Sequence, residues 1–124
     1  MANTRFLIKS LGLVEYSTTW QAMKEFTDTR THQTDDEISL VQHFPVFTQG
    51  VAGKPEHVLN PNGIPIIKTD RGGQVTYHGP GQIIAYLLLD IRRLRLGVRE
   101  LIRCMENSVI DLLKEYRIDA AGRI

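Results

Sequence analysis

Residues 70–82 read DRGGQVTYHGPGQ, and this stretch separates the two halves of the predicted fold. It holds four glycines and one proline around the short β-forming run Val75–Tyr77. Glycine adopts positive φ angles and lets another group approach the backbone closely, so the stretch predicts two loops that flank a short strand. A plain turn needs only one or two glycines, which makes this stretch the first place to look for a binding site.

The segments before this stretch predict strands and one helix. RFLIKSLGLV predicts a strand from Arg5 to a turn near Gly12. Thr18 and Gln21 have the spacing of a capping box, so we expect a helix from there to about Arg30. The other expected elements are a polar loop at 31–37, a strand at 37–44, a glycine-bearing excursion at 45–59 and an edge strand or strand start at 63–70.

The segments after this stretch predict one buried strand and one long helix. Residues 83–90, IIAYLLLD, are apolar almost without interruption, which is typical of a strand buried on both faces. Residues 116–124 predict the end of a helix and the beginning of a strand. The helix itself is predicted by an apolar stripe at three- and four-residue spacing: Val98, Leu101, Ile102, Met105, Val109, Leu112, Leu113 and Tyr116. Together these elements predict an α/β (α+β) fold with a mixed sheet and packed helices.

Composition sets further bounds. A chain of 124 residues with 42% hydrophobic and 23% charged residues is expected to form one globular domain. The net charge of +1 provides no overall field for nucleic acid or an anionic membrane. The N-terminal apolar stretch is too short and interrupted for a signal peptide or a membrane span, and a single cysteine fits a reducing compartment. We therefore expect a cytoplasmic protein.

Four residues of the stretch are candidates for binding or chemistry: Arg71, Gly72, Gly73 and His78. Exposed N–H groups of adjacent glycines can bind an anion or a carbonyl oxygen, and an arginine adds a fixed positive charge. The stretch lacks the Gly-Lys-Ser or Gly-Lys-Thr ending of a phosphate-binding loop and the glycine spacing of a dinucleotide fingerprint. The residues alone leave an acyl pocket and a glycine-rich hairpin both open.

Other reactive residues give weaker signals. Cys104 lies in the middle of the predicted helix, away from the helix N-terminus that favours a thiolate, so we interpret it as a structural, partly buried thiol. His32, His43 and His57 have no metal-ligand spacing and are expected to be surface or packing residues. Residues 35–37, Asp-Asp-Glu, are expected in a solvated loop.

Five arginines lie within twelve residues before and along the second helix: Arg92, Arg93, Arg95, Arg99 and Arg103. In a chain of net charge +1 they form a local positive patch. Such a patch can steer an acidic protein partner, or it can simply be the solvated face of a helix. The sequence leaves both interpretations open.

RGGQVTYHGPGQ, at 71–82, resembles the signature of the lipoyl(octanoyl) transferases, which move an octanoyl group from acyl carrier protein to a lysine of a lipoyl domain. HFPVFTQGVAGKPEHVL and LGVRELI also resemble segments of that family, and the likeness runs from Met1 to about Tyr116. It implies the α/β catalytic domain shared with biotin and lipoate protein ligases. The implied partners are octanoyl-acyl carrier protein, the lipoyl domains of 2-oxoacid dehydrogenase complexes and the glycine cleavage H protein, with no cofactor, metal or nucleic acid.

The resemblance also implies a site and a mechanism. The residues that would line the acyl-substrate pocket are Arg71, Gly72, Gly73, Gln74, Val75, Thr76, Tyr77 and His78. His78 would sit beside the reacting carbonyl, and the acyl group would pass through a cysteine thioester, with the thiolate favoured by a lysine. The alternative is a lipoate–protein ligase, but those enzymes typically carry three glycines followed by His-Asp. The transferase form removes the need for ATP.

The chain departs from this family at its C-terminal end. The family's catalytic lysine and cysteine lie in Gly-x-Lys-Ile-Ala and Asn-Pro-Cys motifs, which do not occur before Ile124, and Lys114 and Cys104 match neither motif. DAAGRI also lacks the Pro-Gly-Val that usually opens the next strand. We therefore expect residues 1–124 to be a single partial acyltransferase domain from a truncated chain. The second hypothesis is a non-catalytic remnant that binds acyl groups or carrier protein. Because its central sheet should lack strands, we also expect the chain to be aggregation-prone or partly molten.

Overall fold

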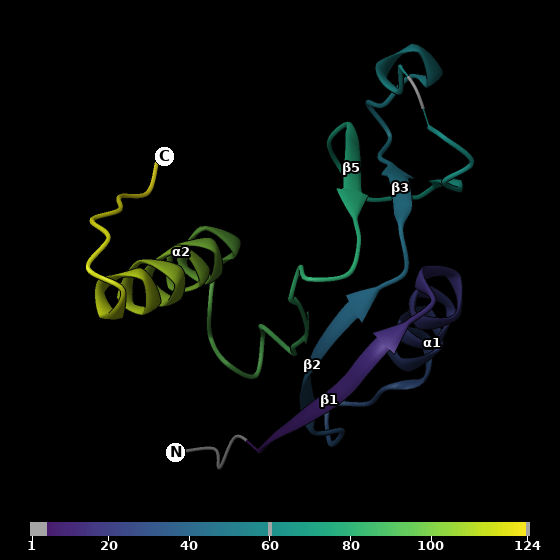
Figure 1. Ribbon diagram of the computed structural model, residues 1–124. Helices are drawn as coiled ribbons and strands as arrows, with labels where there is room; N and C mark the ends of the chain where they lie inside the picture. Colours follow the sequence, from purple (N-terminus) through teal and green to yellow (C-terminus); the bar gives the residue numbers. More distant parts are fainter. Residues whose placement is uncertain (1–4, 60, 124) are drawn as a thin grey trace. The chain divides into compact units, whose positions relative to one another are not determined.

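The computed structural model describes residues 5–59 and 61–123, which form two compact units (Figure 1). The first unit comprises residues 5–59 and 61–89 and contains all the strands. The second comprises residues 90–123 and contains the long helix. No helix in either described part is long and apolar enough to cross a membrane.

One sheet of the first unit has the strand order β1-β2-β6. β1 (Phe6–Val14) and β2 (Asp36–His43) run parallel, and α1 (Tyr16–Thr29) forms the crossover between them. This follows from chain order, because parallel neighbours need a long connection that is usually helical. β6 (Ile84–Leu88) pairs antiparallel with β2, which places Tyr86 opposite Ser39.

The second sheet of this unit has the order β4-β3-β5. β3 (Val46–Gln49) is central, with β4 (Ile66–Lys68) parallel on one side and β5 (Val75–His78) antiparallel on the other. The 3-10 helix η1 (Pro55–His57) lies between β3 and β4 in the chain. β4 is an edge strand, which is one of the two alternatives predicted from Pro65. The α+β architecture confirms the predicted fold class, with two small mixed sheets where one was expected.

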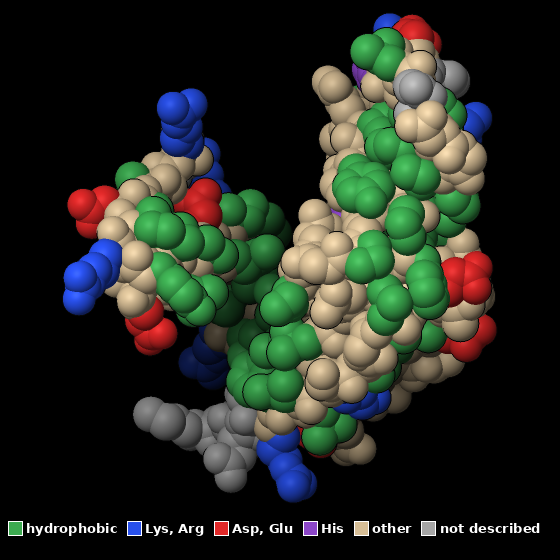
Figure 2. All heavy atoms as spheres, in the orientation of Figure 1, with side chains coloured by type: hydrophobic (Ala, Val, Ile, Leu, Met, Phe, Trp, Pro, Cys, Tyr) green, Lys and Arg blue, Asp and Glu red, His purple; other side chains and the backbone are tan. Residues whose placement is uncertain are grey.

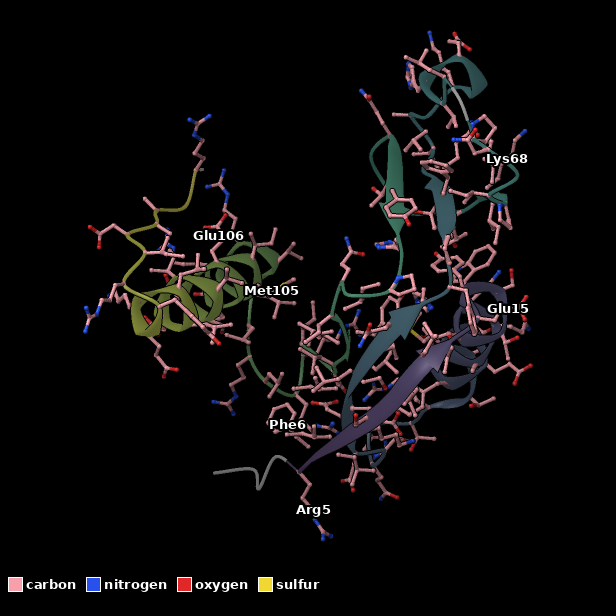
Figure 3. All side chains as sticks on the ribbon, in the orientation of Figure 1. Arg5, Phe6, Glu15, Lys68, Met105 and Glu106 are labelled. Carbon is pink, nitrogen blue, oxygen red and sulfur yellow. The ribbon has the colours of Figure 1, made fainter. Side chains whose placement is uncertain are left out.

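The second unit is built around α2 (Val98–Glu115), which confirms the predicted long helix. The helix begins where the Gly97 N–H donates a hydrogen bond to Glu100 Oε2 at 2.8 Å. Most of its apolar stripe is exposed, with Leu101 and Leu113 half-buried. Figure 3 labels Met105 on this stripe with Glu106 beside it. Figure 2 shows exposed hydrophobic side chains on the first unit as well.

Two details of the N-terminal region differ from the sequence predictions. The chain does not turn near Gly12; β1 continues to Val14 through a bulge between Ser10 and Gly12, where Gly12 has φ +70°. Bulges accept a glycine at positive φ without ending the strand. α1 begins at Tyr16, so Thr18 lies inside the helix and is not its cap.

The acidic segment and the third strand were also predicted wrongly. Asp36 is fully buried at the start of β2 and accepts a 2.7 Å hydrogen bond from Arg30 Nη2, so it is not part of a solvated loop. Strand β3 lies where an excursion was expected, because its polar residues Thr48 and Gln49 are buried and hide its strand pattern.

Two predictions near the C-terminal side are wrong as well. β6 is an edge strand of its sheet, and Ala85 is exposed, so it is not buried on both faces in the described structure. Residues 117–123 contain no strand, and Ile124 lies outside the described residues. The continuous apolar run at 83–90 therefore did not predict whether this strand is central in the sheet or at its edge.

The buried residues of the first unit are largely polar. Tyr16, Val41 and Val46 are the buried hydrophobic side chains among the described residues. Six polar side chains are buried with them: Thr19, Asp36, Ser39, His43, Thr48 and Gln49. Buried polar groups need hydrogen-bond partners, and the partners of His43 and Thr48 lead to the candidate site.

Candidate functional site

The glycine-rich loop is held against the end of β3 by backbone hydrogen bonds. Gly50 N–H donates to Gln74 O at 2.8 Å, Val51 N–H to Arg71 O at 3.0 Å and Ala52 N–H to Gly73 O at 3.0 Å. A side chain at Gly50 would collide with the Gly73 carbonyl, so only glycine permits this approach. The loop conformation thus depends on a glycine outside the loop.

Arg71 secures the same loop from within. Its Nη2 donates to Thr48 O at 2.7 Å, to Thr48 Oγ1 at 2.8 Å and to Gln74 O at 2.9 Å, while Nη1 donates to Gly72 O at 2.9 Å. Thr48 is fully buried in the central strand β3. The guanidinium therefore joins the loop to the sheet through a rigid fork of donors.

These bonds use the loop's carbonyl groups and leave N–H groups available. The carbonyls of Arg71, Gly72, Gly73 and Gln74 all accept hydrogen bonds. Among the described residues, neither Gly72 nor Gly73 donates its N–H, and both glycines are exposed. Adjacent free N–H groups on a fixed loop can bind an anion or a carbonyl oxygen.

Four aromatic rings from four elements meet beside this loop. The His43 ring lies 5.2 Å from that of Tyr16, 6.1 Å from that of His78 and 5.8 Å from that of Tyr86. Tyr16 also stacks on His78 at 6.3 Å. We call these residues, Tyr16, His43, His78 and Tyr86, the ring cluster. The pKa of Tyr16 is raised by burial and lowered in part by the charge of Arg71, which connects the cluster to the loop.

Hydrogen bonds fix the state of His43. Its Nδ1 lies 2.9 Å from Val14 O and its Nε2 lies 2.7 Å from the Tyr86 hydroxyl. A carbonyl only accepts, so Nδ1 carries the proton and Nε2 accepts from Tyr86. Burial lowers the pKa of His43, partly offset by the Val14 carbonyl, and His78 lowers it further. Burial also raises the pKa of Tyr86, so both groups are neutral at pH 7.

His78 has a different environment. It is half-buried at the end of β5, and its Nδ1 lies 2.6 Å from Gln82 Oε1. Its Nε2 has no hydrogen-bond partner among the described residues. His78 is thus the histidine of the ring cluster that keeps a ring nitrogen for a ligand.

An apolar cavity of about 610 Å³ opens next to the ring cluster, between α1 and the β1-β2-β6 sheet. Glu15 and Phe44 line it and are chain neighbours of Tyr16 and His43, and Val14, which also lines it, is the hydrogen-bond partner of His43. Figure 3 labels Glu15 just before α1. The apolar lining residues are Leu11, Leu13, Val14, Ala22, Met23, Phe26, Phe44 and Leu88. The ion pair of Lys9 and Glu37, at 2.9 Å, also lines the cavity.

Residues 15–123 match the model of the family described as the lipoyl protein ligase A/B catalytic domain. The chain belongs to this family. Octanoyltransferases of Nitrosospira multiformis and Nitrosomonas europaea are each 65% identical over 93% of the chain, which covers 54% and 56% of their lengths. The chain thus spans about half the length of the curated relatives it matches.

Solved structures agree on the lipoyl protein ligase fold. Lipoate-protein ligase A bound with ATP is similar with a TM-score of 0.63 at 15% identity, over 97% of this chain and 50% of that one. Protein Ta0514 of T. acidophilum, which carries a provisional lipoate protein ligase name, has a TM-score of 0.69 at 17% identity, over 94% and 50%. The fold relationship implied by the sequence resemblance is confirmed.

The structure brings together some of the site residues predicted for this family member and separates others. Arg71, Gly72, Gly73 and Gln74 form the docked loop, and His78 joins the ring cluster. Val75, Thr76 and Tyr77 form β5 between them, with Tyr77 packed on Phe47 at a ring distance of 5.4 Å. None of the eight lines the apolar cavity. Their role as an acyl-binding site stays a prediction.

Sequence reasoning missed Tyr16, His43 and Tyr86. His43 was interpreted as a surface or packing residue, and its full burial agrees with packing; that both of its ring nitrogens are hydrogen-bonded was not predicted. The available signal was a histidine near the end of a predicted strand.

Cys104 lies on α2, in the unit of residues 90–123. It is exposed, so the prediction of a partly buried thiol is wrong. Within the described ranges no group of three or more histidine, cysteine, aspartate or glutamate side chains could hold a metal ion.

Proposed function

We propose that the protein takes part in octanoyl transfer from octanoyl-acyl carrier protein to a lysine of lipoyl domains, in the cytoplasm. The observation that carries this proposal is the 65% identity to octanoyltransferases over 93% of the chain. That match includes the glycine-rich loop and the ring cluster. The acceptors proposed are the lipoyl domains of 2-oxoacid dehydrogenase complexes and the glycine cleavage H protein.

The geometry supports separate roles for the loop, the cavity and His78 in binding the acyl group. The free N–H groups of Gly72 and Gly73 suit the acyl carbonyl oxygen, on which negative charge develops during acyl transfer. The apolar cavity suits the acyl chain, since its volume of about 610 Å³ lies in the ordinary range of small-ligand pockets. Arg71 acts by holding the loop, and His78 offers its free ring nitrogen beside the carbonyl.

The proposed chemistry proceeds by two displacements. A cysteine thiolate, kept ionised by a lysine, attacks the octanoyl thioester of the carrier protein, and the carrier thiol leaves with a proton. The lysine amine of the lipoyl domain then attacks the new thioester, loses a proton and forms the amide, which releases the cysteine. This route needs no metal and no nucleotide. The cysteine and lysine would come from Asn-Pro-Cys and Gly-x-Lys motifs outside residues 1–124.

We further propose that residues 1–124 are one partial acyltransferase domain that transfers no octanoate alone. A non-catalytic protein that binds acyl groups or carrier protein is the second candidate. What supports it is that Cys104, the single cysteine of the chain, is exposed on α2 and does not stand in an Asn-Pro-Cys motif.

The test compares this chain with the product of the longest reading frame that contains it. Each is incubated with octanoyl-acyl carrier protein and an unmodified lipoyl domain, and intact masses are measured. We expect octanoylated lipoyl domain from the longer product without ATP, and no thioester on Cys104 of the chain. A requirement for ATP and a free acid would instead identify a ligase. Absence of transfer with a carrier-protein complex would favour the non-catalytic candidate.

A further inference from the structure

The Gly79–Gln82 segment, which follows β5, forms a turn that returns the chain toward His78. Gln82 N–H donates to Gly79 O at 3.2 Å, and Gly81 has φ +90°. Proline followed by a glycine at positive φ is the pattern of a type II turn. The turn is tied to β2, since Gly81 N–H donates to Gln42 Oε1 at 2.7 Å.

This turn places the side-chain amide of Gln82 on the ring of His78. The distance from Gln82 Oε1 to His78 Nδ1 is 2.6 Å. An amide oxygen only accepts hydrogen bonds, so Nδ1 must carry the proton when His78 is neutral. The lone pair then lies on Nε2. Neutral histidine in water prefers the Nε2–H tautomer, so the contact with Gln82 shifts His78 to the tautomer that is less favoured in water.

Of the four ring nitrogens in the ring cluster, only one is uncommitted among the described residues. Both nitrogens of His43 are used by Val14 and Tyr86. The uncommitted atom is His78 Nε2.

We propose that Gln82 is a positioning residue that holds His78 in the Nδ1–H tautomer and makes Nε2 a proton acceptor for a ligand. An acceptor at this atom fits an N–H, O–H or S–H group, not a carbonyl oxygen. This sharpens the predicted role of His78, which was only to sit beside a carbonyl. If the proposed acyl transfer is correct, on which this part rests, the group that gives the proton is the attacking lysine amine or the thiol.

The direct test measures the tautomer by ¹⁵N NMR of the histidine ring nitrogens in the 124-residue chain, at a pH where His78 is neutral. We expect a protonated Nδ1 in the wild type. Gln82→Glu keeps the acceptor oxygen and should keep this tautomer, whereas Gln82→Leu should move His78 mainly to the Nε2–H form. Gln33→Leu, at an exposed loop position, is the matched control and should change nothing.

A protonated Nε2 in the wild type, or an unchanged tautomer in Gln82→Leu, overturns the proposal. Because this measurement needs no activity, it stands apart from the acyl-transfer test. In the longer product, Gln82→Leu should lower kcat about fivefold at unchanged KM, the factor for one ordinary hydrogen bond. Gln82→Glu should restore most of kcat, and equal loss in both variants would contradict positioning through the tautomer.

Discussion

Replacing Arg71 should release the glycine-rich loop from β3 while leaving the rest of the first unit folded. Arg71→Met removes three hydrogen bonds to Thr48, at 2.7, 2.8 and 3.3 Å, and those to the loop carbonyls. Arg71 is half-buried, so we count only the two shorter bonds to Thr48, at about 1 kcal/mol each. The buried Thr48 hydroxyl then loses its partner, which adds about 1 kcal/mol.

The expected cost is therefore about 3 kcal/mol of local stability, or roughly a 100-fold change in the loop-opening equilibrium. Amide hydrogen exchange measures this opening equilibrium directly, because the N–H groups of Gly50, Val51 and Ala52 are protected only while the loop is docked. Their exchange rates should rise about 100-fold in Arg71→Met, and by less in Arg71→Lys, which keeps the charge but not the fork of donors.

Arg5→Met is the matched control, because Arg5 is an exposed arginine of the same unit. It should leave these three exchange rates unchanged. If Arg71→Met also left them unchanged, Arg71 would not hold the loop, and a direct ligand contact would become its better explanation.

The pKa of His43 is lowered in the folded state, so the unfolded protein takes up a proton on His43 first as the pH falls. With respect to this group, the free energy of unfolding should be constant above about pH 6.5 and decline below it. Urea titrations between pH 7.5 and 5 measure this, and the same decline in a His43→Gln variant would assign it elsewhere. Tyr86→Phe leaves His43 Nε2 unpaired and should lower the free energy of unfolding by about 1–2 kcal/mol, again by urea titration; no loss would mean that water replaces the hydroxyl. Gly50→Ala should cost about 1–3 kcal/mol, because its side chain meets the Gly73 carbonyl. Gly72→Ala, which has open space around it, should cost little; equal thermal shifts in the two variants would contradict the close approach.

The sequence predicted elements whose apolar residues follow a simple period, and failed where burial depends on partners. α2 was predicted from its apolar stripe. β3 was missed because Thr48 and Gln49 are buried polar residues, satisfied in part by Arg71, which lies 23 positions from Thr48 in the chain. Asp36 was assigned to a solvated loop because its partner Arg30 comes from the end of α1. No local pattern encodes such pairs.

The same limit applies to the candidate site. The glycine-rich loop was found because its unusual residues are consecutive. The ring cluster was not, because Tyr16, His43 and Tyr86 are single residues whose meeting depends on strand register and on where α1 begins. Pairing of β2 with β6 and of β3 with β5, with Val46 opposite His78, brings them together. Register is a property of the assembled sheets and cannot be read from one strand.

In both the loop and the ring cluster, internal hydrogen bonds use most of the polar groups and leave a few of them for a ligand. In the loop, internal bonds consume the carbonyls and leave the Gly72 and Gly73 N–H groups. In the ring cluster, they consume three of four ring nitrogens and leave His78 Nε2. What remains is two donors and one acceptor. Acyl transfer needs donors for the oxygen that gains charge and an acceptor for the proton that the nucleophile loses. If Gln82→Leu converts Nε2 into a donor, the site keeps its oxygen donors and loses its proton acceptor, so the two requirements can be separated by one substitution.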